Sequence, residues 1–319
     1  MPVKFAVVMD PPEQLNPIKD SSLAMLEEAQ ARGWQTYYVS PHSLTYSETV
    51  IADCIPIKLQ LNQQDWYVLG EPEARPLADM DIIIMRVDPP FNMNYIYTTY
   101  LLELAEKQGA LVVNRPQSLR DANEKLFTLQ FPQCCAPTMV SSDMGRLKAF
   151  QKEHGDIIVK PLDGMGGASI FRMKQDDPNI AVILETMTEH GKTPIIAQRF
   201  IPEISAGDKR ILIIDGKPIP YALARIPAEG ETRGNLAAGG SGVGVELTDR
   251  DRWICEQVGP SLSKMGLSFV GIDVIGDYIT EINVTSPTCI RELDKIYNLN
   301  ISKTLLDVLE EAHLRSKQD

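Results

Sequence analysis

The segment around Lys160 is the first part of the sequence whose residues could do chemistry. Lys160 closes an apolar run over residues 157–160, and the loop that follows, residues 163–169 (DGMGGAS), is rich in glycine. Glycine lets backbone N–H groups approach a phosphate closely, and the lysine adds a positive charge. The lysine precedes the glycines, so the loop is not of the Walker A type. We predict a phosphate-binding loop, with an ordinary surface turn as the alternative.

Carboxylate and amide side chains near the C-terminal end form a second feature. Glu281 and Asn283 lie two residues apart in a strand-like run, so both point to one face of that strand. With Asp273 they offer the oxygen ligands that Mg²⁺ takes together with phosphate oxygens. Asp273 shares their face only if the hairpin has an odd-length loop or a bulge, because a two-residue turn would pair it with Thr280. A solvent-facing polar edge is the alternative.

Three arginines form a third feature. Arg210 and Arg225 lie on the two arms of a hairpin predicted around Asp215-Gly216, where they can approach each other in space. Arg233 lies in a glycine-rich loop. Guanidinium groups suit carboxylate and phosphate because they hold either with two hydrogen bonds. Unrelated surface arginines are the alternative.

These residues must be positioned by the surrounding elements, and the first 120 residues alternate between strands and helices. Continuous apolar runs are typical of strands buried on both faces, which predicts an open, mostly parallel sheet flanked by helices. Residues 55–69 are more irregular and are compatible with a hairpin at the edge. The expected strands are residues 5–9, 37–39, 82–85 and 111–113, and the expected helices are residues 20–32 and 95–107.

The rest of the chain follows a different pattern, with hairpins in place of parallel strands. Residues 226–244 contain six glycines and little apolar periodicity, so we expect a functional or disordered loop. Residues 124–131, 147–154, 249–265 and 302–314 are expected helices, and residues 157–160, 170–173, 195–201, 210–214, 219–225 and 269–284 are expected strands or hairpins.

Composition excludes some classes of function. The net charge of −12 argues against nucleic acid or an anionic membrane as a partner, because both need clustered Lys and Arg. No apolar run reaches about 18 residues, so no membrane span is expected. The five cysteines show no metal-ligand spacing and no even framework, which predicts reduced thiols in a cytoplasmic protein.

Several longer stretches resemble prokaryotic glutathione synthetase, a family of the ATP-grasp superfamily. The resemblance extends over essentially the whole chain, and its last two stretches are more specific than a short glycine loop. The stretches are residues 8–11 (VMDP), 85–91 (MRVDPPF), 114–127 (NRPQSLRDANEKLF), 160–171 (KPLDGMGGASIF), 232–240 (TRGNLAAGG) and 281–291 (EINVTSPTCIR).

The fold that this resemblance implies is mixed α/β and α+β. It consists of an N-terminal open parallel αβ sheet domain and an ATP-grasp fold of two lobes, with ATP between antiparallel sheets. Residues 1–122 would form the N-terminal substrate domain and residues 123–200 the small lobe. Residues 201–319 would form the central lobe, with a lid loop at residues 226–244 that keeps water from the reaction.

The resemblance also implies ligands and site residues. Two Mg²⁺ ions, or Mn²⁺ in their place, would be held by Asp273, Glu281 and Asn283, with Glu281 bridging them. ATP would contact Lys125, Lys160, Gly164, Gly166, Gly167, Ser169, Gln198, Arg199, Phe200, Ile201 and Asp208. The family has asparagine or a similar residue at Arg199, which matters little because the hinge binds adenine through its backbone. The catalytic residues would be Arg210, Arg225 and Arg233. The substrates would contact Lys19, Asp20, Ser21, Arg86, Asn235, Ser286, Pro287 and Thr288.

The reaction implied by the resemblance joins γ-glutamylcysteine to glycine and converts ATP to ADP and phosphate through an acyl-phosphate. Homotetramers are expected from the family. Related ATP-grasp ligases that add glutamate to peptides or join two D-amino acids are an alternative with the same chemistry. A non-catalytic ATP-binding module would have lost metal ligands or the loop, and a dinucleotide-binding oxidoreductase would need Gly-x-Gly-x-x-Gly after its first strand, where the sequence has none.

Overall fold

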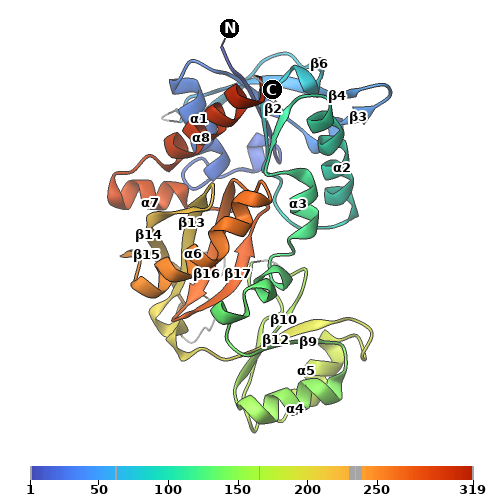
Figure 1. The fold of residues 1–319 in the computed structure, drawn as a ribbon, viewed down its shortest axis with the longest axis vertical. Coiled ribbons are helices and arrows are strands. Elements are labelled where there is room, and N and C mark those ends of the chain that lie inside the picture. Colours follow the sequence, from blue (N-terminus) through green and yellow to red (C-terminus); the bar gives the residue numbers. More distant parts are fainter. Residues whose placement is uncertain (1, 62, 165, 230–233, 235–238, 318–319) are drawn as a thin grey trace.

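The structure is a computed structural model that describes residues 2–61, 63–164, 166–229, 234 and 239–317. Figure 1 shows three tiers along the long axis, each built around its own sheet. Both ends of the chain lie in the upper tier. Within the described residues, no helix has the length and apolar character needed to cross a bilayer.

The upper tier, called the N-terminal lobe here, contains four parallel strands in the order β2-β1-β7-β8. The strands are mostly apolar and buried, apart from polar residues at the start of β1 and β2, because helices cover both faces of the sheet. Along β1, Ala6 and Val8 pack on the side of α2, while Phe5 and Val7 pack on the side of α1. The predicted open parallel sheet is confirmed. Its elements are β1 (Lys4–Val8), α1 (Ser21–Ala31), β2 (Gln35–Val39), β7 (Ile82–Met85), α2 (Met93–Lys107) and β8 (Leu111–Val113).

Antiparallel strands extend the sheet beyond β2. The long strand β4 (Val50–Leu59) pairs with β2 and with three short strands. The predicted edge hairpin is confirmed by the pairing of Ile57 with Leu69, and the observed edge is larger than predicted. The short strands are β3 (Thr45–Tyr46), β5 (Tyr67–Leu69) and β6 (Glu73–Pro76).

The lowest tier, the small lobe, is a four-stranded antiparallel sheet in the order β11-β10-β12-β9. Two helices cover it and share a separate core with it. The predicted helix at 124–131 is a shorter 3₁₀ helix, η4 (Leu126–Gln130), because Asn123 Oδ1 caps two N–H groups of a tight turn. The elements are β9 (Thr138–Ser141), α4 (Met144–His154), β10 (Ile157–Pro161), β11 (Phe171–Met173), α5 (Ile180–Met187) and β12 (Ile195–Arg199).

The middle tier, the central lobe, is a five-stranded antiparallel sheet in the order β15-β14-β13-β16-β17. One expectation was wrong here, because the loop predicted for residues 226–244 ends in a strand. β15 pairs with β14 from Ser241 onward, and its alternating glycines, Gly242 and Gly244, hide the apolar pattern of a strand. Residues 230–233 and 235–238 lie outside the described residues, so the lid stays a prediction. The elements are β13 (Asp208–Ile214), β14 (Lys217–Ile226), β15 (Ser241–Glu246), α6 (Asp249–Lys264), β16 (Phe269–Ile275) and β17 (Tyr278–Asn283).

After β17 the chain returns to the N-terminal lobe, as Figure 1 shows. Helix α8 (Ile301–Ser316) packs against α1, where Leu305 and Leu309 share a core with Leu23. Arg32 NH2 also donates to Asp307 Oδ1 at 2.7 Å. The helices α3 (Pro116–Asp121), α5 and α7 (Ile290–Tyr297) were not predicted, and each is only six to eight residues long.

A buried asparagine joins the N-terminal lobe to the central sheet. Asn114 follows β8, and its Nδ2 donates to the carbonyl oxygens of Phe269 and Val284 at 2.8 and 2.9 Å. Its Oδ1 accepts from Phe269 N at 2.9 Å. One side chain therefore satisfies backbone groups at the start of β16 and just after β17, the two strands that carry the site residues described below.

Replacing Asn114 by alanine should lower the free energy of unfolding by about 3 kcal/mol, because three hydrogen bonds are lost and buried backbone groups are left without partners. Urea denaturation measures the change. Asn94→Ala, at an exposed position of α2, is the control and should change stability by less than about 0.5 kcal/mol. Equal effects of the two substitutions would contradict the joining role.

Candidate active site

A β-bulge in the hairpin of β16 and β17 decides which side chains face one another. The turn has two residues, 276 and 277, so a regular ladder would pair Asp273 with Thr280. The register shifts instead, and Asp273 pairs with Glu281. Thr280 is the extra residue, and its Oγ1 donates to the Asp273 carbonyl oxygen at 3.2 Å. The bulge therefore puts Asp273, Glu281 and Asn283 on one face of the hairpin.

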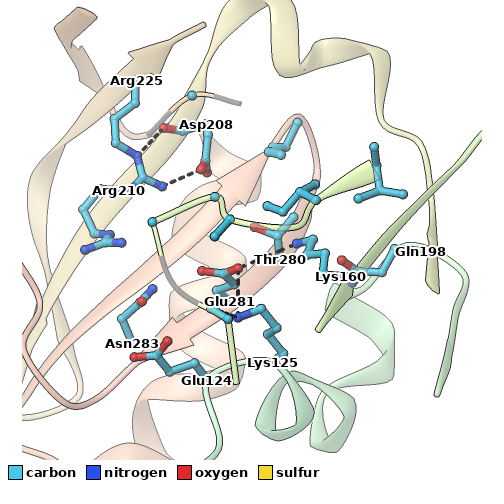
Figure 2. A pocket seen from close by; sticks show the side chains of 18 of the residues that line it. Glu124, Lys125, Lys160, Gln198, Asp208, Arg210, Arg225, Thr280, Glu281 and Asn283 are labelled. Atoms are coloured by element: carbon cyan, nitrogen blue, oxygen red, sulfur yellow. Dashed lines mark hydrogen bonds and ion pairs between the residues drawn. The ribbon is translucent and has the colours of Figure 1, made fainter. Parts of the chain in front are cut away.

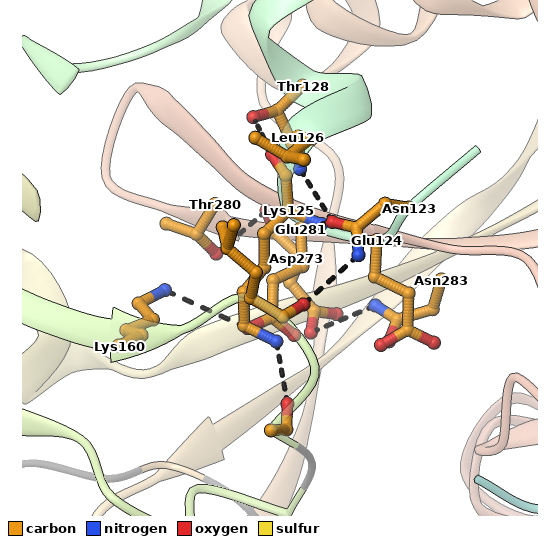
Figure 3. A network of polar contacts seen from close by, with 12 residues as sticks. Asn123, Glu124, Lys125, Leu126, Thr128, Lys160, Asp273, Thr280, Glu281 and Asn283 are labelled. Atoms are coloured by element: carbon orange, nitrogen blue, oxygen red, sulfur yellow. Dashed lines mark hydrogen bonds and ion pairs between the residues drawn. The ribbon is translucent and has the colours of Figure 1, made fainter. Parts of the chain in front are cut away.

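Lysines from two distant segments meet at Glu281 (Figures 2 and 3). Lys125 Nζ and Lys160 Nζ each lie 3.7 Å from Glu281 Oε1. Lys125 Nζ also donates to the carbonyl oxygen of Gly164 in the glycine loop, at 2.7 Å. The two lysine side chains are only 4% and 10% exposed, so water screens their charges poorly. The result is a concentrated positive charge beside a single carboxylate.

Two arginines of the central sheet share a buried carboxylate. Arg210 donates from Nε and NH2 to the two oxygens of Asp273, at 2.5 and 3.0 Å. Arg225 NH2 lies 2.5 Å from Asp208 Oδ2 and 2.9 Å from Asp273 Oδ2. These contacts follow from the register, since Asp208 pairs with Arg225 across β13 and β14, and Arg210 pairs with Asp273 across β13 and β16. Figure 2 shows Arg225 with Asp208, and Arg210 beside them.

Burial shifts the pKa values of the two aspartates in opposite directions. Burial acts to raise the pKa of Asp273, but Arg210 and Arg225 outweigh it and hold that pKa well below its usual range. Burial raises the pKa of Asp208 to about 6, against the pull of Arg225. Asp208 Oδ1 is also buried without a hydrogen-bond partner in the described part of the chain. The negative charge of Asp273 is thus compensated by its two arginines, whereas Asp208 Oδ1 remains as a hydrogen-bond acceptor for a ligand.

The glycine loop needs glycine for two different reasons. At Gly164, a Cβ would lie 2.4 Å from Pro161 Cγ, so a side chain would push the loop away from β10. At Gly166, φ is +62°, in the left-handed region that glycine adopts without strain. The loop can therefore lie close to Lys125 and Lys160 and present backbone groups to an anion.

The opposite end of the site is more apolar. Gln198 and Arg199 end β12, and the Arg199 side chain turns away to donate from NH2 to the Tyr278 hydroxyl at 3.1 Å. Ile158, Ile204 and Ile275 line the cavity here. A lining of isoleucine side chains suits a flat, weakly polar ring.

These groups line one cavity of about 320 Å³ between the small and central lobes. Most predicted site residues reach it, whereas Asp273 lies just behind the wall. Those lining the cavity are Lys125, Lys160, Gly164, Gly166, Gly167, Gln198, Arg199, Phe200, Ile201, Asp208, Arg210, Arg225, Glu281, Asn283, Ser286 and Thr288. Ser169, Pro287, Lys19, Asp20, Ser21 and Arg86 do not line it, and Arg233 and Asn235 lie outside the described residues.

The predicted dipeptide contacts lie on the N-terminal lobe. The carboxylate of Asp20 caps α1 by accepting from Leu23 N at 2.9 Å. Arg86 is buried, and its NH2 donates to the Pro287 carbonyl oxygen at 2.8 Å. Arg86 NH1 is buried without a partner in the described residues. Arg86 therefore links this lobe to the segment after β17 and keeps one N–H group unused.

The donor set fits a divalent cation of the Mg²⁺ type. Glu281 and Asn283 lie on the cavity wall, and Asn283 Nδ2 donates to Asp273 Oδ2 at 3.3 Å (Figure 3), which leaves the amide oxygen of Asn283 uncommitted. Two carboxylates and one amide are hard oxygen donors, and Mg²⁺ sites of this size are completed by phosphate and water. The described residues contain no cluster of three or more His, Cys, Asp and Glu side chains, which argues against an all-protein metal site.

The sequence patterns missed several residues of the wall. Glu124, Asp88, Thr285 and Cys289 line the cavity from loops or helix ends. Thr280 does so as the bulge residue. Glu124 stands next to Lys125 in the chain, and Asp88, Thr285 and Cys289 lie in the stretches that resemble the family, but no periodicity distinguishes them.

Asp273→Asn should lower the free energy of unfolding by about 3–5 kcal/mol, because Arg210 is left as a buried charge without its partner. Asp307→Asn is the matched control. It removes a half-exposed partner of Arg32 and should cost less than about 1 kcal/mol. Chemical denaturation measures the free energy of unfolding of both variants. Similar losses of stability in the two would show that the buried network is not held by Asp273.

Two sequence models of one family together match most of the chain. The prokaryotic glutathione synthetase N-terminal domain matches residues 3–120, and the prokaryotic glutathione synthetase ATP-grasp domain matches residues 124–298. Glutathione synthetase from Pseudomonas aeruginosa is 57% identical over 310 residues, covering 97% of this chain and 98% of that protein. The proteins of the same name from Shewanella oneidensis and Vibrio vulnificus are 55% and 54% identical, each over 97% of this chain and 98% of their own length.

Solved structures with the same fold are distant in sequence. An ATP-grasp ligase from Chryseobacterium gregarium, in complex with ADP and a leader and core peptide, matches with a TM-score of 0.67 at 16% identity, covering 97% of both chains. D-Alanyl-alanine synthetase A from Vibrio cholerae matches with a TM-score of 0.60 at 12% identity, covering 99% of this chain and all of that one. The fold is therefore the ATP-grasp fold, and with relatives above 50% identity along its length the chain belongs to the prokaryotic glutathione synthetase family.

Proposed function

We propose that this chain uses ATP to join γ-glutamylcysteine to glycine, giving glutathione, ADP and phosphate through an acyl-phosphate. The observation that carries the proposal is the meeting of Lys125, Lys160 and Glu281 in one cavity with the arginines of the central sheet. A triphosphate needs positive charge at its phosphates and oxygen ligands for its metal, and this cavity offers both. Family membership and full-length relatives support the choice of substrates.

Nucleotide binding is proposed for the face between the two antiparallel sheets. Lys125 and Lys160 contact the phosphates, and the loop at 163–169 covers them. The backbone of residues 198–201 receives the adenine, and the isoleucine-lined end of the cavity supports this placement. Asp208 contacts the nucleotide through its unpartnered oxygen.

Two Mg²⁺ ions, or Mn²⁺, are proposed at Asp273, Glu281 and Asn283, with Glu281 between them. Metal bound there neutralises phosphate charge in the transferring group. Both oxygens of Asp273 are held by Arg210 and Arg225, so Asp273 could hold a metal ion only if at least one of these arginine contacts were exchanged.

The chemical step requires positioning and charge stabilisation. A carboxylate oxygen of the dipeptide attacks the γ-phosphorus of ATP, and ADP leaves. The glycine nitrogen, in its neutral amine form, then attacks the acyl carbon, and phosphate leaves with one of the amine protons. Arg210 and Arg225, with Arg233, stabilise the oxyanion that forms in between. The dipeptide contacts Lys19, Asp20, Ser21, Arg86 and Asn235, and residues 286–288 lie at the glycine site.

The larger organisation is proposed on the same grounds. Residues 1–122 form the N-terminal substrate domain, residues 123–200 the small lobe and residues 201–319 the central lobe, with a lid at 226–244. A homotetramer is proposed from the family resemblance. All five cysteines are free, which supports work in the reducing cytoplasm.

Phosphate release tests the proposed reaction directly. We expect release only when γ-glutamylcysteine, glycine and Mg-ATP are all present, and loss of release when any one is omitted. Glutamate or D-alanine in place of glycine tests the related ligases with other amines. Turnover with one of those amines and none with glycine would reject the substrate assignment.

Arg225→Ala should lower kcat by about 10²–10³-fold, because one donor to the oxyanion is removed. Steady-state phosphate release measures kcat, and a thermal melt checks that the variant is folded. Arg146→Ala removes an arginine whose side chain is 77% exposed on the small lobe and should leave kcat unchanged. An undiminished kcat in folded Arg225→Ala would remove Arg225 from the mechanism.

A further inference from the structure

The proposed reaction brings a positive charge into the cavity that no residue discussed so far receives. Free glycine carries an ammonium group at neutral pH, and a charged group entering a poorly solvated site needs a partner of opposite charge. Among the described residues, the cavity wall has four carboxylates: Asp88, Glu124, Asp208 and Glu281. Asp208 is paired with Arg225, and Glu281 with two lysines. Asp88 and Glu124 have no ion pair within the described part of the chain.

Glu124 is held against the strand that carries the metal ligands. Its Oε1 accepts from Thr285 Oγ1 at 3.0 Å, and its backbone carbonyl oxygen accepts from Ile282 N at 2.8 Å. Figure 2 shows its carboxylate beside Asn283, on the far side of Lys125 from Gln198. In the described residues, no other side chain donates to this carboxylate. One carboxylate oxygen of Glu124 is thus held by a hydrogen bond, and the other is available to a ligand. The carboxylate lies next to the segment that continues into Ser286.

The charge of Glu124 is poorly compensated. Burial raises its pKa, and nearby Glu281 raises it further, while Lys125 pulls in the opposite direction. Burial raises the pKa of Asp88 as well, but a hydrogen bond with Ser286 and nearby Arg86 act against that rise, and Asp88 is exposed whereas Glu124 is half-buried. A cation gains more from a less solvated, less compensated carboxylate than from one that is open to water. Of the two unpaired carboxylates, Glu124 is therefore the stronger site for an ammonium group.

We propose that Glu124 binds the ammonium group of the incoming amino acid, an inference that rests on the proposed ligase function. The carboxylate holds the ammonium group beside the acyl-phosphate and accepts one of its protons, so that the neutral nitrogen can attack, and Thr285 orients the carboxylate. Glu124 and Thr285, together with the residues after β17, then select a small, charged amine as the substrate. Acyl-phosphate formation does not involve Glu124, so the two half-reactions can be separated by experiment.

The test compares a charged with an uncharged nucleophile. Hydroxylamine is mostly neutral at neutral pH and traps acyl-phosphates as hydroxamates. For Glu124→Gln, the glycine KM should rise about 10–100-fold, the effect of losing a charge-assisted contact. The KM for ATP and the rate of hydroxamate formation should stay within about twofold of wild type. Glu124→Asp keeps the charge and should recover part of the glycine affinity.

The control is Glu106→Gln, which removes a half-buried carboxylate of α2, away from the cavity, whose pKa burial also raises. It should change none of these values. The proposal would be overturned if Glu124→Gln lost activity with glycine and with hydroxylamine to the same extent. It would also be overturned if the glycine KM rose in Asp88→Asn but not in Glu124→Gln. Absence of hydroxamate with the wild-type chain would reject the ligase function itself, and with it this inference.

Discussion

The contact of one carboxylate with two lysines from distant segments is the interaction on which the site depends. Glu281 lies on the central lobe, while Lys160 lies on the small lobe and Lys125 on the segment that connects the lobes. Without ligand, this one carboxylate is the ion-pair partner of both lysines, which leaves an excess of positive charge in a poorly solvated space. A triphosphate would compete for the same lysines, and a divalent cation would take over the carboxylate. Metal and nucleotide binding would then be coupled, because each would relieve the charge that the other leaves unpaired.

That arrangement requires the bulge at Thr280. The turn of the hairpin sets one register and the bulge shifts it by one residue, so that Glu281 faces the cavity beside Asn283. Register has the same effect in the neighbouring strands, because cross-strand pairing places each arginine of β13 and β14 beside an aspartate. The electrostatics of the site thus follow from backbone register, and the apolar core behind the sheet fixes that register.

The sequence predicted the sheets, the hairpins and most of the cavity wall, since apolar runs and turn residues report local structure directly. The glycine loop pointed to Lys160, but placing Lys125 with it required the family resemblance, because no local pattern brings two segments 35 residues apart together. The short helices α3, α5 and α7 were not predicted, and two further features were missed or left undecided. The strand β15 has glycines where strands usually have apolar side chains, and its pairing with β14 stabilises it. The bulge was one of two ways to align Asp273 with Glu281, and only the three-dimensional register distinguishes them.

The return of α8 to the first tier has a consequence for synthesis on the ribosome. The apolar face of α1 is completed by Leu305 and Leu309, near the end of the chain. The first lobe to leave the ribosome is thus the last to be finished, and its leucines stay uncovered until almost the whole chain has been translated. Nascent chains of this protein must therefore expose an apolar surface throughout elongation, which makes them natural clients for chaperones that bind such surfaces.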